Sequence, residues 1–470
     1  IWNMSLIILT FSLSIFGTFL TRSGIISSVH AFATSNIGPW FGTFLLIVFF
    51  GSLTLLILRL DTLKSDGRLE ALLSRESTFV FNNMVLVGIA LTVLLLTTFP
   101  MLSELVTDRK VTMGPPIFNL VNIPWALVLL LLTGTGPLIA WRKASRENLR
   151  RNFVFPVMCG LWVLVLVSIL DFSNIAAGFR GFAAALGSLD VARAFEEMRG
   201  IYPAVTFGLG AFVIGTVTLE FYRGVRVRIR RNGESVAVAT GRLLWRSKRR
   251  YGGYIVHVGV VVIFFGIAGS SAYKTEAVQT LLPGQSMSID GYDVRYHNSS
   301  LEAVDDHLGA VTWIAVTQDG EDLGLIRAEQ RFHPNLVFPE LRTAFLHAKA
   351  ARSEGREAYQ QAVARVYPVI QNLEGRAGRE VKIPSTEVGI RASMNPFRIS
   401  RFGEDLYVTP LWVDPATGQA NFRVFVNPMV NFIWLGGLIL VFGAHLSVLP
   451  DARERKSLLA AIDEEERAVA

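Results

Sequence analysis

Long apolar stretches alternate with short polar segments along most of the chain. Eight of these stretches are about 19 to 22 residues long, which is enough for a helix to cross a hydrocarbon core about 30 Å thick. They are predicted at roughly 1–20, 38–59, 78–99, 123–141, 153–171, 201–222, 253–272 and 429–448. Because the core of a bilayer holds no water to satisfy backbone polar groups, each stretch is expected to be a helix.

One long hydrophilic segment, residues 273–428, separates the last two apolar stretches and has the pattern of strands. Apolar and polar residues alternate on both sides of Asp319-Gly320, which predicts a hairpin with its turn there. A second hairpin is predicted to turn at Pro415–Gly418, and a stretch of helical composition near 344–370 interrupts the strands. We therefore expect an α-helical polytopic membrane protein with about eight spans and a β-rich domain that carries a helical insertion.

Basic residues gather in alternate loops, and this gives the chain an orientation. The most basic loop, "RGVRVRIRRNGESVAVATGRLLWRSKRRYGG", follows the sixth stretch, and the positive-inside rule makes it cytoplasmic. The expected organisation is a bundle of seven spans over 1–272, an extracytoplasmic β-rich domain over 273–428, and the last span with a cytoplasmic tail over 429–470. The net charge of +7 is then a sign of topology. Basic loops beside anionic membrane lipid explain it better than a nucleic-acid partner.

The composition and the first residues of the chain further narrow the classes of protein to which it could belong. A chain that is 51% hydrophobic and 18% charged does not fit an ordinary soluble enzyme. It begins on Ile1 and enters an apolar stretch at once, so we expect a fragment or processed product with more chain upstream. The first stretch is too long for a signal peptide and lacks a cleavage site of small residues. Cys159 is the single cysteine, so the sequence has no CxxC or CxxCH motif.

Ionisable residues inside membrane spans are costly and therefore mark candidate sites. Asp171 and Glu220 are expected at span ends, where water reaches them. His257 lies deeper, in "YGGYIVHVGVVVIFFGIAG", about five residues inside the cytoplasmic boundary. Helical spacing puts it on one face with the small residue Gly253 and with Phe264.

Two interpretations of His257 remain open from the residues alone. A neutral imidazole in an apolar slot suits the iron of a haem, and Arg249 and Arg250 at the cytoplasmic end could meet its propionates. A histidine that bridges two helices by hydrogen bonds explains the same pattern. His445 lies at a similar depth in the last span, so a bis-histidine pair is geometrically possible, although an interfacial histidine is the favoured interpretation.

A further histidine, His30, stands in the loop after the first span, in "TRSGIISSVHAFA". A lone loop histidine is most often a solvated surface residue, and the neighbouring Arg22 an interface anchor. Nevertheless, an external haem site would use the same residue types: His30 as axial ligand, Arg22 as propionate partner and Phe32 as a wall. The remaining histidines, His297, His307, His333 and His347, show no HxxxH or HExxH metal-binding spacing.

Several segments resemble the CcmF/NrfE-type cytochrome c haem lyases, in the order in which that family has them. They are "FSLSIFGTFLTRSGIISSVHAFA", "TMGPPIFNLVNIPWALVLLLLTGTGPLIAWR", "YGGYIVHVGVVVIFFGIAGSSAY", "PSTEVGIRASMNPFRISRFGEDLYV" and "NPMVNFIWLGGLILVFGAHLS". The first of these is the most specific. The family's tryptophan-rich motif is absent, as are the second external and second intramembrane histidines, so the resemblance implies the C-terminal portion of such a lyase.

The resemblance implies a role in cytochrome c maturation at the bacterial inner membrane. Such proteins receive haem from a haem chaperone at the outer face and promote its thioether attachment to the CxxCH motif of apocytochrome c, with maturation subunits that hold the apocytochrome and reduce its thiols. It further implies that His30 ligates the incoming haem and His257 a resident b-type haem, and we place Arg22 at a propionate. The alternatives are an inner-membrane haem or solute transporter and a non-catalytic scaffold of the maturation complex. The absence of a chain of intramembrane carboxylates argues against the transporter.

Overall fold

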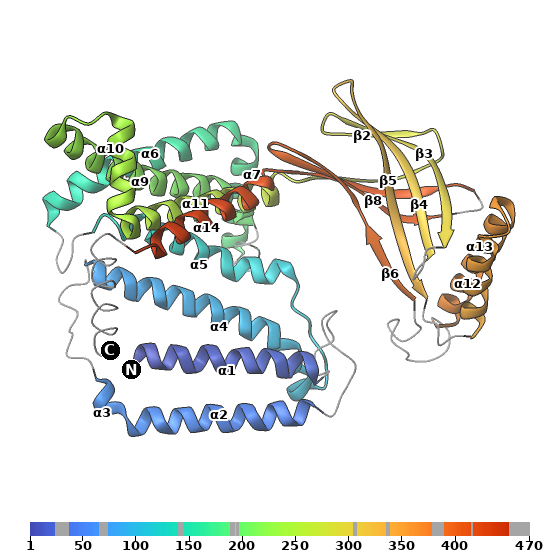
Figure 1. Cartoon of the computed structure of the whole chain (residues 1–470), viewed down its shortest axis with the longest axis horizontal. Helices are drawn as coiled ribbons and strands as arrows, with labels where there is room; N and C mark the ends of the chain where they lie inside the picture. The colour runs from blue at the N-terminus through green and yellow to red at the C-terminus, as the bar shows by residue number, and fades with distance from the viewer. Residues whose placement is uncertain are drawn as a thin grey trace, which may run out of the picture. The chain divides into compact units, whose positions relative to one another are not determined.

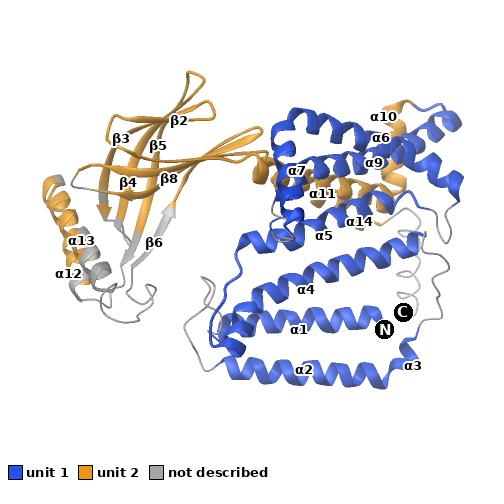
Figure 2. Ribbon diagram, turned by 180° about the vertical axis from the view of Figure 1, so that it is seen from behind, with its two compact units in different colours: residues 1–234 blue, residues 235–470 orange. Residues whose placement is uncertain are grey.

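The computed structural model of the chain contains two compact units, Ile1–Glu234 and Ser235–Ala470, which are coloured separately in Figure 2. The structure describes residues 1–23, 37–64, 74–139, 145–188, 193, 197–303, 308–334, 339–377, 390–414 and 417–450. Most of the helices and strands in these ranges are labelled in Figure 1.

The first unit is built of helices in its described part. They are α1 (Trp2–Arg22), α2 (Gly38–Leu58), α3 (Leu60–Leu63), α4 (Arg75–Thr107), α5 (Pro115–Thr135), α6 (Arg146–Leu170), α7 (Phe172–Gly187), the 3-10 turn η1 (Met198–Gly200) and α9 (Tyr202–Asn232). Helix α1 packs against α2, α4 against α5, and both α5 and α6 against α9. Glycines allow the closest of these approaches. A methyl group on Gly160 of α6, for example, would lie 2.9 Å from the Gly208 carbonyl oxygen of α9.

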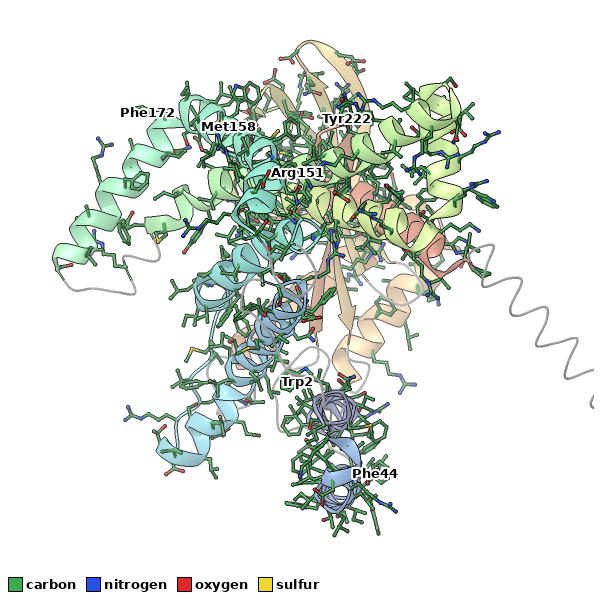
Figure 3. All side chains as sticks on the ribbon, turned by 90° about the vertical axis from the view of Figure 1, so that its left-hand side faces the viewer. Trp2, Phe44, Arg151, Met158, Phe172 and Tyr222 are labelled. Carbon is green, nitrogen blue, oxygen red and sulfur yellow. The ribbon has the colours of Figure 1, made fainter. Side chains whose placement is uncertain are left out.

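Eight described helices are long and apolar enough to cross a membrane, which confirms the number of spans predicted from the sequence. They are Trp2–Arg22, Gly38–Leu58, Arg75–Thr107, Pro115–Thr135, Arg146–Leu170, Tyr202–Asn232, Lys248–Ala272 and Val430–Val448. Large apolar side chains point outward from them. Phe44 and Met158, labelled in Figure 3, are 48% and 60% exposed, as expected of residues that face lipid.

The position of Glu220 corrects one expectation. The apolar pattern ends near residue 222, but α9 continues to Asn232, because its basic residues also favour a helix. Glu220 is buried, at 8% exposure, although the sequence predicts that water reaches it. Its carboxylate lies 3.6 Å from the guanidinium of Arg223 on the next turn.

Arg223 also ties three helices of the first unit together. It donates to the side-chain oxygen of Asn152 on α6 at 2.8 Å and to the Arg151 carbonyl at 3.2 Å. Asn152 in turn donates to the Leu138 carbonyl, just after α5, at 3.1 Å. A hydrogen-bonded cluster of polar groups thus joins the ends of α5, α6 and α9.

The described part of the second unit contains five helices, two of which belong to the β-rich domain. Its helices are α10 (Val236–Arg246), α11 (Lys248–Ala272), α12 (Pro339–Ala351), α13 (Arg356–Ala377) and α14 (Asn431–Val448), of which α12 and α13 form the predicted helical insertion. Its strands are β1 (Thr275–Leu281), β2 (Ser286–Ile289), β3 (Tyr292–Ala303), β4 (Leu308–Gln318), β5 (Glu321–Pro334), β6 (Ile390–Asn395), β7 (Phe397–Arg401), β8 (Glu404–Val413) and β9 (Ala420–Pro428).

The strands form two antiparallel sheets, in the orders β1-β9-β8-β7 and β2-β3-β4-β5-β6. Both predicted hairpins are present. The β4–β5 hairpin turns at Asp319 and Gly320, whose φ angles of 49° and 87° match the left-handed turn that Asp-Gly favours. The hairpin β8–β9 pairs Val413 with Ala420 next to its turn.

One apolar core lies between the two sheets. The five-stranded sheet contributes Tyr292 and Tyr296, and the four-stranded sheet contributes Phe422, whose ring centroid lies 5.1 Å from that of Tyr296. The helical insertion adds Phe345 and Val363 to the same core. The insertion is therefore part of the domain's packing and not an appendage.

Helices α11 and α14 pack along glycines spaced seven residues apart: Gly252, Gly259 and Gly266 on α11, and Gly436 and Gly443 on α14. A spacing of seven returns to the same helix face after two turns, so these glycines form one continuous contact, here called the glycine seam. Beyond the seam, α11 leads into β1 and β9 leads into α14. These two strands pair in register from Thr275 and Val426 to Leu281 and Ala420.

Candidate cofactor site on helix α11

His257 lies in the middle of α11, on the side of the helix that faces away from α14. An α-helix turns by about 100° per residue. His257 is therefore rotated by about 140° from Gly252 and about 160° from Gly259, the two glycines that contact α14 on either side of it. The imidazole consequently projects from the face opposite the glycine seam.

The described residues offer His257 no hydrogen bond. Its Nδ1 atom is buried and has no partner among them. A buried polar nitrogen without a partner costs about 1–3 kcal/mol. No hydrogen bond among the described residues therefore supports the interpretation of His257 as a bridge between helices. A role of the imidazole as a ligand is consistent with this arrangement.

Two adjacent glycines near His257 have different surroundings. A methyl group on Gly252 would lie 2.8 Å from the Gly443 carbonyl oxygen, so this glycine permits the close approach of α14. A methyl group on Gly253 would meet nothing within 4 Å. Since Gly253 precedes His257 by four residues, it lies on the same face one turn away, and it leaves open space beside the imidazole.

A basic side chain is fixed near the N-terminal end of α11, on the same face. Arg250 donates from its Nε atom to the Tyr254 hydroxyl at 3.0 Å, and its guanidinium carbon lies 5.8 Å from the Tyr254 ring centre. The spacing of Arg250, Tyr254 and His257 is four and then three residues, which places them in one row along the helix. Along the helix, the face therefore offers a cation at Arg250, open space at Gly253, a ring at Tyr254 and an imidazole at His257.

His445 does not complete this site. Its neighbour Gly443 faces Gly252 and Val256 of α11, and His445 follows it by two residues, or about 200° around α14. His445 is exposed, on the side of α14 away from the seam. The two imidazoles thus leave the helix pair on different sides, and a bis-histidine ligand pair between α11 and α14 is not formed.

Of the three residues predicted for the external haem site, the structure describes only Arg22. His30 and Phe32 lie outside the described residues, so the external haem site stays a prediction. Arg22 is described: it is exposed in the last turn of α1, where a cation interacts favourably with the carboxyl end of the helix. Within the described ranges, no group of three or more His, Cys, Asp or Glu side chains is arranged to hold a metal ion.

The chain is similar to known cytochrome c-type biogenesis proteins over nearly its whole length. The chain is 32% identical to the cytochrome c-type biogenesis protein CycK of Bradyrhizobium diazoefficiens over 460 residues, which cover 97% of this chain and 56% of CycK. It is 29% identical to CcmF of Pseudomonas aeruginosa over 456 residues, again 97% of this chain and 56% of the relative.

The chain is a homologue of the CcmF, CycK and NrfE cytochrome c-type biogenesis proteins. The relation extends to NrfE of Haemophilus influenzae, with 24% identity over 462 residues, which are 97% of this chain. No protein-family profile matches the chain. The chain spans about half the length of the curated homologues it matches.

A solved structure supports the fold. The structure named cytochrome c heme lyase CcmF superposes with a TM-score of 0.58 and 21% sequence identity, over 96% of this chain and 55% of the other. This likeness agrees with the predicted fold class, a polytopic helical membrane protein with a β-rich domain.

Proposed function

We propose that this chain is part of a membrane haem lyase of cytochrome c maturation. Its homologues are cytochrome c-type biogenesis proteins over 97% of the chain, and the fold matches a structure named cytochrome c heme lyase. The reaction proposed is the covalent thioether attachment of haem to the CxxCH thiols of apocytochrome c. Because the chain spans about half of its homologues, the activity is expected to need further protein segments as well.

The observation that carries this proposal is the state of His257. A histidine within a membrane span, whose buried Nδ1 has no partner among the described residues and which has open space one turn away, fits a ligand of a flat apolar cofactor. We assign this face to a resident b-type haem: His257 would bind its iron, Arg250 would pair with a propionate, and Gly253 would leave room for the ring. Such a haem would supply electrons, one at a time, for reduction of the haem that is to be attached.

Residues of α11 and α14 position Arg250 and His257. Tyr254 holds the Arg250 guanidinium by its hydroxyl, so that its charge is already directed when a carboxylate arrives. The glycine seam holds α11 against α14 from the other side and thereby fixes the direction of His257.

The haem to be attached is proposed to bind at the periplasmic surface of the membrane. There, His30 is proposed to ligate the incoming haem and Arg22 to contact one of its propionates. A haem chaperone would deliver the haem, and maturation subunits would hold apocytochrome c and keep its thiols reduced. The proposed location is the bacterial inner membrane with the β-rich domain on the periplasmic side, in accord with the basic cytoplasmic loops.

An absorption spectrum of the protein purified from its native membrane tests the resident haem. We expect the α and Soret bands of a low-spin b-type haem, lost or shifted in a His257→Ala variant. His445→Ala is the matched control, because that imidazole is exposed on the other helix and faces away from the site. A His257→Ala protein with an unchanged spectrum would contradict the assignment.

The same preparations separate the two alternatives. A scaffold without a cofactor would be colourless before any substitution and would still hold its partners after His257→Ala. A transporter would move haem or another solute across a liposome membrane, independently of apocytochrome c. A scaffold without a cofactor does not account for the His257 Nδ1 atom, which is buried and has no partner among the described residues.

A further inference from the structure

The turn between β7 and β8 exposes a large aromatic side chain. Phe402 is 93% exposed, more than the other large apolar side chains in the described part of the chain. It is followed by Gly403, whose φ of +104° favours glycine and makes the tight reversal possible. Exposing a phenylalanine ring to water is unfavourable. We therefore expect Phe402 to contact an apolar partner.

Hydrogen bonds tie this turn to the beginning of α14. The backbone nitrogen of Met429 donates to the Gly403 carbonyl. The side-chain amide of Asn431 donates to the Arg401 carbonyl. Because one bond comes from each side of Phe402, the tip of the turn is fixed in position relative to the first residues of the helix.

The ring of Phe402 therefore lies at the level of a membrane span. Its centroid is 6.1 Å from that of Phe432, the second residue of α14, and α14 has the length and composition of a span. Trp434, two residues further along, is 68% exposed. Aromatic side chains at the end of a span are typical of the boundary between headgroups and acyl chains.

The charged side chain next to Phe402, that of Arg401, points away from the tip of the turn. Arg401 forms an ion pair with Glu321 of β5 at 2.8 Å, which turns its guanidinium back toward the β-rich domain. The tip of the turn therefore presents an aromatic ring without an acceptor or donor of its own. Lipid surrounds the outer face of a span, so lipid is the partner that meets a ring fixed beside the span's first turn.

We propose that the β7–β8 turn is a membrane-contact site, at which Phe402 inserts into the interfacial layer of the bilayer beside α14. The β-rich domain then has two attachments to the membrane: the paired strands β1 and β9, which continue into α11 and α14, and this turn. The second attachment limits rotation of the domain about the first. It sets the height and tilt of the four-stranded sheet above the lipid surface.

Depth-dependent fluorescence quenching tests the proposal on the whole protein in lipid nanodiscs. Replacing the single cysteine by Cys159→Ala leaves a background into which Phe402→Cys is introduced and labelled with bimane. Lipids brominated near the headgroup are expected to quench this label severalfold more strongly than aqueous iodide does. Since Phe402 is 93% exposed, the substitution gives up only its ring contact with Phe432.

Two positions in the same unit serve as controls. Trp434→Cys, on the span itself, should behave as Phe402→Cys does. Thr417→Cys lies beyond the other end of β8, which is about 30 Å long, and should respond to iodide only. A label at 402 that iodide quenches as strongly as the label at 417 would overturn the proposal. A label at 402 that neither quencher reaches would show a protein partner and overturn it equally.

Discussion

Gly259 of α11 and Gly436 of α14 face each other so closely that neither leaves room for a side chain. A methyl group on Gly259 would lie 2.8 Å from the Gly436 carbonyl oxygen, and one on Gly436 would lie 2.6 Å from the Gly259 carbonyl oxygen. Backbone meets backbone here, so neither partner can yield by rotating a side chain. This contact holds together the helix that carries His257 and the last span.

Gly259→Ala is therefore expected to loosen the helix pair. Overpacking of this kind typically costs about 1–3 kcal/mol, and here the opposing atoms are backbone, which places the cost at the upper end. The thermal unfolding temperature in detergent should fall accordingly. Gly437→Ala is the matched control, since a methyl group there meets nothing within 4 Å and alanine favours the helix. Equal unfolding temperatures for the two variants would show that the seam contributes no stability.

Gly253→Leu is expected to fill the open space beside His257. The added side chain should displace a flat cofactor from this face and weaken or abolish the proposed b-type absorption, while the unfolding temperature of the cofactor-free protein remains unchanged. Gly437→Leu also adds a side chain in open space, but on α14, and should leave the absorption intact. An undiminished haem content in Gly253→Leu would place the cofactor elsewhere.

Tyr292 gives the β-rich domain an alkaline limit. Burial, followed by its hydrogen bond to Glu404 at 2.7 Å, raises the pKa of the Tyr292 phenol well above its usual value. A raised folded-state pKa contributes stability that is complete below the unfolded-state pKa, about 10, and is lost as the pH rises through the folded value. Unfolding of the domain should therefore become easier above about pH 10.

A Tyr292→Phe variant tests this origin of the alkaline limit. It loses the hydrogen bond to Glu404 and so starts from a lower stability at neutral pH, by about 1 kcal/mol. Its stability should then decline less between pH 9 and pH 11 than that of the parent, in unfolding followed by circular dichroism. Identical slopes in the two proteins would attribute the alkaline loss to other groups.

Asn152→Ala is expected to destabilise the contact among α5, α6 and α9. The substitution leaves the Arg223 guanidinium and the Leu138 carbonyl without the amide that connects them. An unfolding free energy lower by about 1–3 kcal/mol is expected, because groups that lose a buried partner are not rehydrated. Asn174→Ala is the control: this amide bonds to Asp171 on an exposed surface at 2.7 Å, so its loss should have little effect on thermal unfolding.

Much of the fold could be predicted from the sequence because the membrane imposes a simple rule. A span requires a long apolar stretch, and a helix long enough to cross a membrane overlaps each of the eight stretches, although α5 runs from Pro115 to Thr135 instead of over 123–141. The Asp319-Gly320 hairpin was equally predictable, since few residue pairs adopt its left-handed turn. Helices α7 and α10 were not anticipated. Their short, mixed compositions give no span-like signal, and their formation depends on neighbours that a local pattern does not contain.

The candidate site was less accessible to prediction. Helical spacing does place Gly253 and His257 on one face, but the sequence alone does not distinguish Gly253 from Gly252. One glycine lies in open space and the other against a backbone carbonyl. The seven-residue repeat of Gly252, Gly259 and Gly266 was a usable signal for the latter role. It indicates the side that faces α14, and hence that His257 and His445 point away from the shared seam.

The in-register pairing of β1 with β9 makes the β-rich domain an insertion between the helices α11 and α14. Cα atoms paired across antiparallel strands are about 4.5–5.5 Å apart, so the chain leaves and re-enters the membrane region at nearly the same point. Excising the intervening residues would leave two ends that a tight turn of two residues can join. The domain is thus exchangeable as a module: a shorter, longer or unrelated fold could occupy this position without a change in how α11 and α14 meet.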